Sequence, residues 1–110
     1  MIKNTINLEE YRTQGSRVFT GRDRGIDVRL RSNINKIEAE SGKISIIIPN
    51  DIGSINPSFL EEFLFDVVVK LKYEAFFAKF SFECGGRYKI ENDLQEAVER
   101  ILREETALVH

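Results

Sequence analysis

Apolar residues in this chain gather in blocks separated by polar turns, and the most regular block follows Pro57. Its apolar positions recur in pairs every four residues, which predicts a helix with a broad apolar face. Asn56 can cap this helix, and Pro57 suits the first helical position, where a missing N–H costs nothing. The apolar positions are Phe59, Leu60, Phe63, Leu64, Val67, Val68 and Leu71.

The block before it, residues 43–48, contains four isoleucines and almost no polar alternation. Such a β-branched run predicts a central strand covered on both faces. Pro49 ends it, because proline cannot donate to a strand ladder, and residues 50–53 form a turn. Residues 44–71 therefore form a strand, a turn and a helix around which we expect the rest of the chain to be organised.

Residues 20–41 predict an earlier helix of roughly four turns. Thr20 is its expected cap, with Asp23 reaching back in an acidic variant of the capping box, and Gly42 follows its end. The expected buried stripe consists of Ile26, Leu30, Ile34 and Ile37.

The start of the chain gives weaker patterns. Ile2, Ile6 and Leu8 share one parity, which fits a half-buried strand. Residues 17–19 form a second short apolar piece. We expect a first strand here and a short extended segment after it.

The last third of the chain predicts a strand and a helix. Phe80, Phe82 and Cys84 alternate with polar residues, so we expect them on one face of a strand. Asn92 is the expected cap of a final helix. The buried stripe of that helix is Leu94, Ala97, Val98, Ile101 and Leu102.

The order helix, strand, helix, strand, helix implies right-handed crossovers and a sheet that is at least partly parallel. We therefore expect an α/β fold, with a small mixed, partly parallel β-sheet and helices mainly on one face. No internal repeat, low-complexity tract or linker interrupts residues 1–110, so we expect a single domain over that range.

Charge and composition exclude several classes of function. Sixteen Lys and Arg nearly balance eighteen Asp and Glu, and acidic residues dilute the arginines at 22–31, so we expect no nucleic-acid partner. The single cysteine, Cys84, suits a reducing compartment. No apolar run is long enough to span a membrane, and we expect a cytoplasmic protein.

Residues for catalysis or metal binding are scarce. The one histidine, His110, leaves a serine or cysteine nucleophile without a positioned base, and one Cys with one His forms no metal-ligand cluster. Gly85-Gly86 is separated from the last helix by Tyr88–Glu91, which favours a turn over a phosphate loop. We expect no enzyme, no metal and no cofactor.

The candidate site is the polar start of the helix that follows the isoleucine strand. Free amides in a first helical turn attract anions, and Ser58 carries a hydroxyl there that could be phosphorylated. Glu61 and Glu62 would repel the added charge. The simpler interpretation is that Ser58 merely suits a helix start.

Four stretches between Val18 and Glu104 support a family resemblance: FTGRDRGIDVRLRSNI, ISIIIPNDIGSINPSFLEEFL, FSFECGG and NDLQEAVERIL. Together they resemble the STAS-like domains of unknown function, relatives of the sulphate-transporter and anti-sigma-factor-antagonist (STAS) fold. The most specific part is the strand, the turn and the Ser-Phe-x-Glu-Glu helix start. A weaker sign is the Arg-x-x-Gly opening of residues 22–25.

The resemblance implies a module without catalysis of its own that controls a protein partner by docking the helix start. In anti-sigma-factor antagonists the partner is a histidine-kinase-like ATPase, which phosphorylates a serine at the position matching Ser58. The chain departs from that motif: Asn56 replaces an Asp, Pro57 a Ser and Phe59 a Gly.

The expected docking residues are accordingly Asn56, Ser58, Glu61, Glu62 and Arg22. An alternative is a nucleotide- or anion-binding module, or a small enzyme, that uses the helix start at 56–62 with Arg22. A third interpretation is a homodimer, suggested by the breadth of the apolar face from Phe59 to Leu71.

Overall fold

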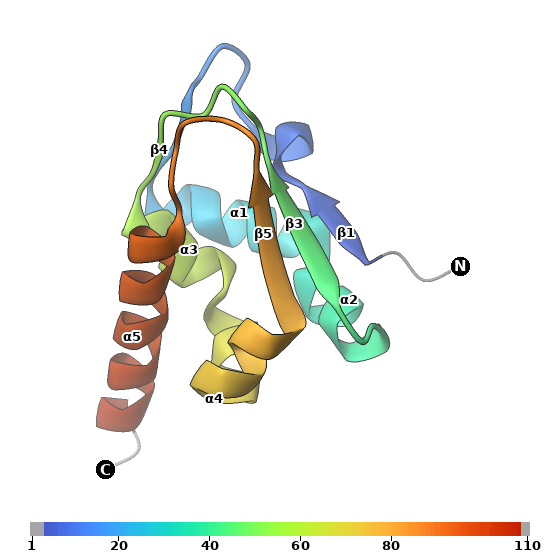
Figure 1. The fold of residues 1–110 in the computed structure, drawn as a ribbon. Helices are drawn as coiled ribbons and strands as arrows, with labels where there is room; N and C mark the ends of the chain where they lie inside the picture. The colour runs from blue at the N-terminus through green and yellow to red at the C-terminus, as the bar shows by residue number, and fades with distance from the viewer. Residues whose placement is uncertain (1–3, 109–110) are drawn as a thin grey trace.

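The computed structural model describes residues 4–108, so Ile2 and His110 lie outside the described residues (Figure 1). The elements in chain order are β1 (Thr5–Asn7), the 3-10 helix η1 (Leu8–Tyr11), β2 (Val18–Phe19), α1 (Arg22–Ser32), α2 (Ile34–Glu40), β3 (Ile44–Ile48), β4 (Ser54–Ile55), α3 (Pro57–Phe63), α4 (Phe65–Lys79), β5 (Phe80–Cys84) and α5 (Glu91–Leu108).

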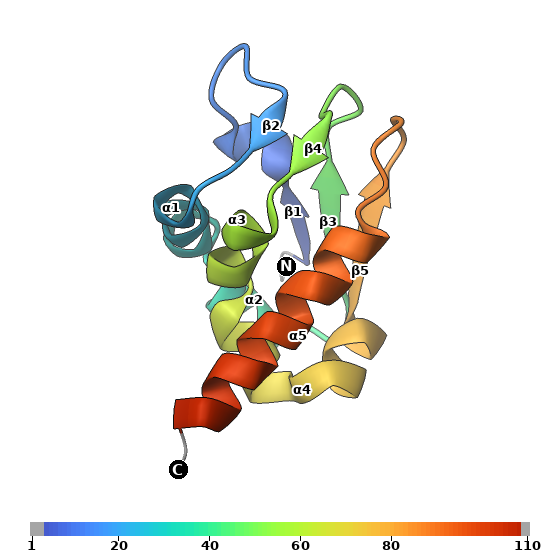
Figure 2. The same cartoon turned by 90° about the vertical axis from the view of Figure 1, so that its left-hand side faces the viewer.

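Three strands form the main sheet in the order β1-β3-β5, and all of its pairs are parallel. The central register aligns Ile6, Ile46 and Phe82 across it. A separate parallel pair joins β2 to β4. The helices lie on one face of the main sheet, as the two views show (Figures 1 and 2). The α/β class with a small sheet and helices mainly on one face is thereby confirmed, and the sheet expected to be mixed and partly parallel is parallel in every described pair.

The expectation that the isoleucine strand is covered on both faces is wrong. Ile44, Ile46 and Ile48 are buried against the helices, whereas Ser45 and Ile47 are only half-buried on the opposite face. The strand therefore alternates between buried and partly exposed positions despite its uniform composition.

The helix expected over residues 20–41 is two helices. Asn33, with φ of 60°, adopts the left-handed conformation between α1 and α2. Gly21, not Thr20, precedes α1, and no side chain caps it. The expected stripe is also wrong at Leu30, which is 69% exposed, because α1 buries Gly25 and Val28 instead.

The helix expected from residue 57 to 71 is also divided. Leu64 separates α3 from α4, and α4 continues to Lys79 with a non-helical residue, Lys72, inside it. The broad apolar face belongs to the interior, which removes the basis on which self-association through that face was suggested. The buried residues of this face are Phe59, Leu60, Phe63, Leu64, Val67 and Val68.

The final helix confirms its predicted buried stripe. Leu94, Ala97, Val98 and Ile101 are buried, and Leu102 is half-buried. The helix begins at Glu91, one residue before the expected cap Asn92. None of the helices described is both long and apolar enough to span a membrane.

A buried carboxylate joins α2 to α4. Glu38 is 3% exposed, and its two oxygens accept hydrogen bonds from Lys70 Nζ at 2.8 Å and from Lys79 Nζ at 2.6 Å. Lys79 Nζ also donates to the backbone oxygen of Glu38 at 2.8 Å. Burial by itself raises the pKa of Glu38, but the hydrogen bonds from Lys70 and Lys79 outweigh it, so the pKa lies below its ordinary value.

Candidate functional site

The predicted site residues meet where α1 and α3 begin, on the side of the molecule that faces the viewer in Figure 2. The two helices are in close contact because Gly25 lies between them. A Cβ at Gly25 would lie 2.4 Å from the backbone oxygen of Phe59 and 2.8 Å from Glu62 Cβ. The glycine of the Arg-x-x-Gly opening therefore allows α1 to bring Arg22 beside the start of α3.

Asn56 caps α3 as the sequence predicts. Its Oδ1 accepts from the backbone N–H of Ser58 at 2.8 Å and from the Ser58 hydroxyl at 2.7 Å. Its backbone oxygen accepts from the amides of Phe59 at 3.0 Å and Leu60 at 3.3 Å, and Pro57 has no N–H. The amides of residues 58–60 are thus already hydrogen-bonded within the chain.

Arg22 is close to both predicted glutamates. Its guanidinium donates to Glu62 Oε2 at 3.1 Å and to Glu61 Oε1 at 3.4 Å. Its pKa is raised above the ordinary value, first by the hydrogen bond to Glu62 and then by the charge of Glu61. The Arg22 side chain is 51% exposed and that of Glu62 is half-buried, so this ion pair is reachable from solvent.

Glu61 has a different environment from its neighbour. Its side chain is only 2% exposed, and its second oxygen, Oε2, accepts from Arg100 Nη1 of α5 at 3.3 Å. One carboxylate therefore links α1, α3 and α5 through Arg22 and Arg100. This makes Glu61 a support beneath the surface, while Asn56, Ser58, Glu62 and Arg22 remain accessible above it.

Other arginines of α1 are engaged within the chain. Arg29 donates to the backbone oxygen of Glu62 at 2.9 Å, which further fixes α1 against α3. Arg31 pairs with Asp27 at 3.2 Å, and Arg24 donates to the Thr13 hydroxyl at 2.8 Å. The basic group noticed in the sequence thus consists of side chains with partners inside this chain.

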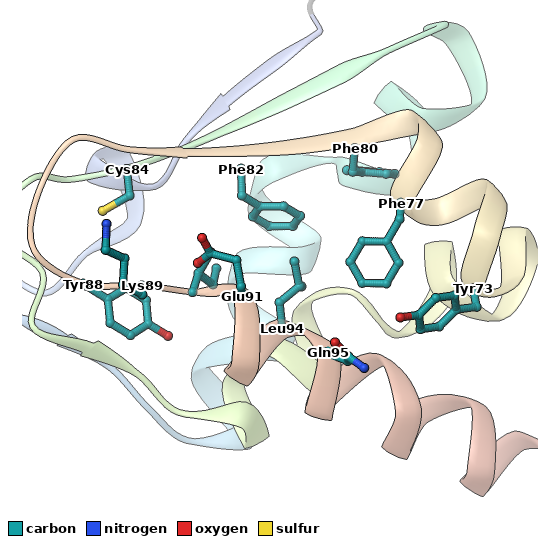
Figure 3. A pocket seen from close by; sticks show the side chains of 11 residues that line it. Tyr73, Phe77, Phe80, Phe82, Cys84, Tyr88, Lys89, Glu91, Leu94 and Gln95 are labelled. Atoms are coloured by element: carbon teal, nitrogen blue, oxygen red, sulfur yellow. The ribbon is translucent and has the colours of Figure 1, made fainter.

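A second feature, which was not predicted from the sequence, is a pocket of about 450 Å³ beside β5 (Figure 3). It lies between β5, the end of α4 and the start of α5. Lys89, Glu91 and Gln95 stand around it. The alternation of Phe80, Phe82 and Cys84 was the available signal, since it predicts these side chains on one face of a strand. The apolar and aromatic lining residues are Tyr73, Phe77, Phe80, Phe82, Cys84, Tyr88, Ile90 and Leu94.

Comparisons of the chain with protein-family models, with curated proteins and with solved structures found no match. Within residues 4–108, no group of three or more His, Cys, Asp or Glu side chains could hold a metal ion.

Proposed function

We propose that this protein is a non-enzymatic regulatory module that docks a protein partner through the surface formed by Asn56, Ser58, Glu62 and Arg22. We call these four residues the α3-start surface. The proposal follows the STAS-like resemblance, in which the partner is a histidine-kinase-like ATPase. Glu61 contributes indirectly, because its buried carboxylate forms an ion pair that positions Arg22.

The observation that carries the proposal is the solvent-accessible Arg22–Glu62 ion pair, one helical turn after Ser58 in α3. Its two charges come from different helices, and their relative position is fixed by the close approach at Gly25 and by the Arg29 hydrogen bond. Such a rigid pattern of donors and acceptors supplies specificity and orientation in a protein interface.

Phosphorylation of Ser58 would alter this surface directly. The Ser58 hydroxyl donates its proton to Asn56 Oδ1, and a phosphorylated Oγ has no proton to donate. The added negative charge would lie one helical turn before Glu62 and its partner Arg22. Phosphorylation is therefore proposed to change both the cap and the charge that a partner meets.

The alternative anion- or nucleotide-binding function receives no comparable support. The amides of residues 58–60 already have acceptors within the chain, and Arg22 is paired with two carboxylates. An anion would have to displace these contacts in order to bind at the helix start.

Substitution of Ser58 tests the switch. Ser58→Asp should reduce capture of the partner from cells at least about tenfold, a loss of roughly 1.4 kcal/mol in binding, because it places a fixed charge on the α3-start surface. Ser58→Ala, which adds no charge, should retain capture. Quantitative mass spectrometry of material bound to the tagged chain measures both. Equal capture by Ser58→Asp and the wild type would contradict the switch.

A further inference from the structure

β5 forms one edge of the three-stranded sheet. Among the described residues, no strand pairs with its outer side. An edge strand directs the N–H and C=O groups of alternate residues outward, where they can pair with another chain. The edge is five residues long, Phe80–Cys84.

This edge has few of the features that commonly protect such strands. Proline, lysine and inward-pointing charge discourage pairing at an edge, and none of them occurs between Phe80 and Cys84, where the one charged residue, Glu83, is exposed on the open face. Instead the strand borders the aromatic pocket, with Phe82 half-buried and Tyr73 40% exposed beside it (Figure 3). Pairing along β5 would cover these aromatic side chains.

We propose that β5 pairs with β5 of a second copy of this chain, antiparallel about a twofold axis through Phe82. The two main sheets then form one continuous sheet, with both helical layers on the same side. This surface is distinct from the α3-start surface and independent of the function proposed for it.

The sequence of β5 is complementary to itself in this register. Phe82 faces Phe82 of the second copy, Ser81 faces Glu83, and Phe80 faces Cys84. Apolar residues thus meet on the helical side, and a hydroxyl meets a carboxylate on the open side. A shift of two residues toward the carboxyl end would instead oppose Glu83 to itself, which like-charge repulsion disfavours.

The two ends of the pocket are also complementary to each other under the twofold axis. The exposed amine of Lys89 lies at the Cys84 end, and the ring of Tyr73 lies at the opposite end (Figure 3). Glu91 also lines the pocket, between these two ends (Figure 3). The axis brings the Lys89 end of one copy beside the Tyr73 end of the other, so a cation meets an aromatic ring. This complementarity favours a second copy as the occupant.

Sedimentation velocity on the full chain measures the association. The wild type should be a dimer at micromolar concentration. Phe82→Glu places two carboxylates opposite each other and should weaken the dimer at least about 100-fold. Leu30→Glu, the same change of charge at an apolar residue exposed on α1, should leave the dimer intact.

Cysteine cross-linking tests the register without a new charge. Residues that face each other in an antiparallel pair have Cα atoms about 4.5–5.5 Å apart, within the range of a disulfide. In a chain with Cys84→Ser, two Phe82→Cys thiols should therefore be oxidised to an intermolecular disulfide by a mild two-electron oxidant. In the same background Ser81→Cys should not link, because the two copies of residue 81 lie on a diagonal of about 7–8 Å.

A wild type that stays monomeric at high micromolar concentration overturns the proposal, as does a Phe82→Glu variant that folds and still forms the dimer. Faster linkage through Ser81→Cys than through Phe82→Cys overturns the register. If Phe82→Glu fails to fold, the sedimentation of the wild type tests the dimer, and the comparison of Phe82→Cys with Ser81→Cys tests the register.

Discussion

Replacement of Gly25 by alanine will lower the free energy of unfolding by about 2 kcal/mol, although alanine is the better helix former. In an unobstructed helix the change would stabilise by about 0.5–1 kcal/mol, because glycine loses more conformational entropy on folding. At this position the new Cβ would lie 2.4 Å from the backbone oxygen of Phe59. A backbone atom cannot rotate away, so α1 and α3 must separate. Overpacking of this kind costs about 1–3 kcal/mol or more.

Gly42→Ala is the matched control. No heavy atom outside its immediate neighbours lies within 4 Å of a Cβ built at Gly42, so this change should be neutral or slightly stabilising. Urea unfolding of the two variants and the wild type measures the difference. A Gly25→Ala protein as stable as the wild type would contradict the close contact of α1 with α3, and with it the fixed position of Arg22.

Replacement of Lys79 by methionine will lower the free energy of unfolding by about 3 kcal/mol at neutral pH. Lys79 contributes two hydrogen bonds to Glu38, one to the carboxylate and one to the backbone oxygen. Without Lys79, the buried carboxylate of Glu38 would be paired only with Lys70, whose side chain is 58% exposed and therefore screened by water. Methionine keeps the apolar stem, so the measurement reports chiefly the charge and the hydrogen bonds.

The effect of Lys79→Met should shrink in acid. In the wild type the folded-state pKa of Glu38 lies below its unfolded value, so its ionisation stabilises the fold above the unfolded pKa and that stability is lost as pH falls through the folded pKa. Without Lys79, burial should dominate and raise the pKa of Glu38, which reverses the sign of its contribution. The difference in unfolding free energy between the wild type and Lys79→Met should therefore become smaller below about pH 4.5.

Lys70→Met is the control for Lys79→Met, since it removes the more exposed of the two amines and should cost about 1 kcal/mol or less. Urea unfolding at several pH values gives the free energy of unfolding as a function of pH for the wild type, Lys79→Met and Lys70→Met. Two results would contradict a dominant role of Lys79 in holding Glu38. One is an equal loss of unfolding free energy in Lys79→Met and Lys70→Met. The other is a difference in unfolding free energy between the wild type and Lys79→Met that stays constant from pH 7 to 3.

The sequence predicted the fold where local pattern and tertiary packing agree. The cap at Asn56, the stripe of α5 and the single face of Phe80, Phe82 and Cys84 follow from spacing and local chemistry alone. The proximity of Arg22 to Glu62 was also foreseen, through the family resemblance, and it occurs at 3.1 Å.

Other features depend on contacts that spacing cannot report. The pattern through Leu30 fits a continuous helix, but Asn33 turns the chain and Gly25 selects a different face by allowing α3 to approach. β3 consists largely of isoleucine on both faces, so composition could not show that Ser45 and Ile47 are only half-buried. Glu61 and Glu62 are adjacent acids at a helix start, and only the position of α5 with Arg100 buries the first and leaves the second reachable.

The docking role of the α3-start surface is tested most directly by comparing Glu62→Lys with Glu40→Lys in capture from the native cell. Both variants exchange a negative for a positive charge at an accessible residue. Glu62 pairs with Arg22, whereas Glu40 is exposed at the end of α2, a helix outside the α3-start surface. Loss of an exposed ion pair costs under about 1 kcal/mol, so both should fold, as thermal unfolding will verify. We predict that the wild type and Glu40→Lys capture a protein partner that Glu62→Lys does not capture. Capture of the same proteins in the same amounts by the wild type, Glu40→Lys and Glu62→Lys would contradict the proposed function.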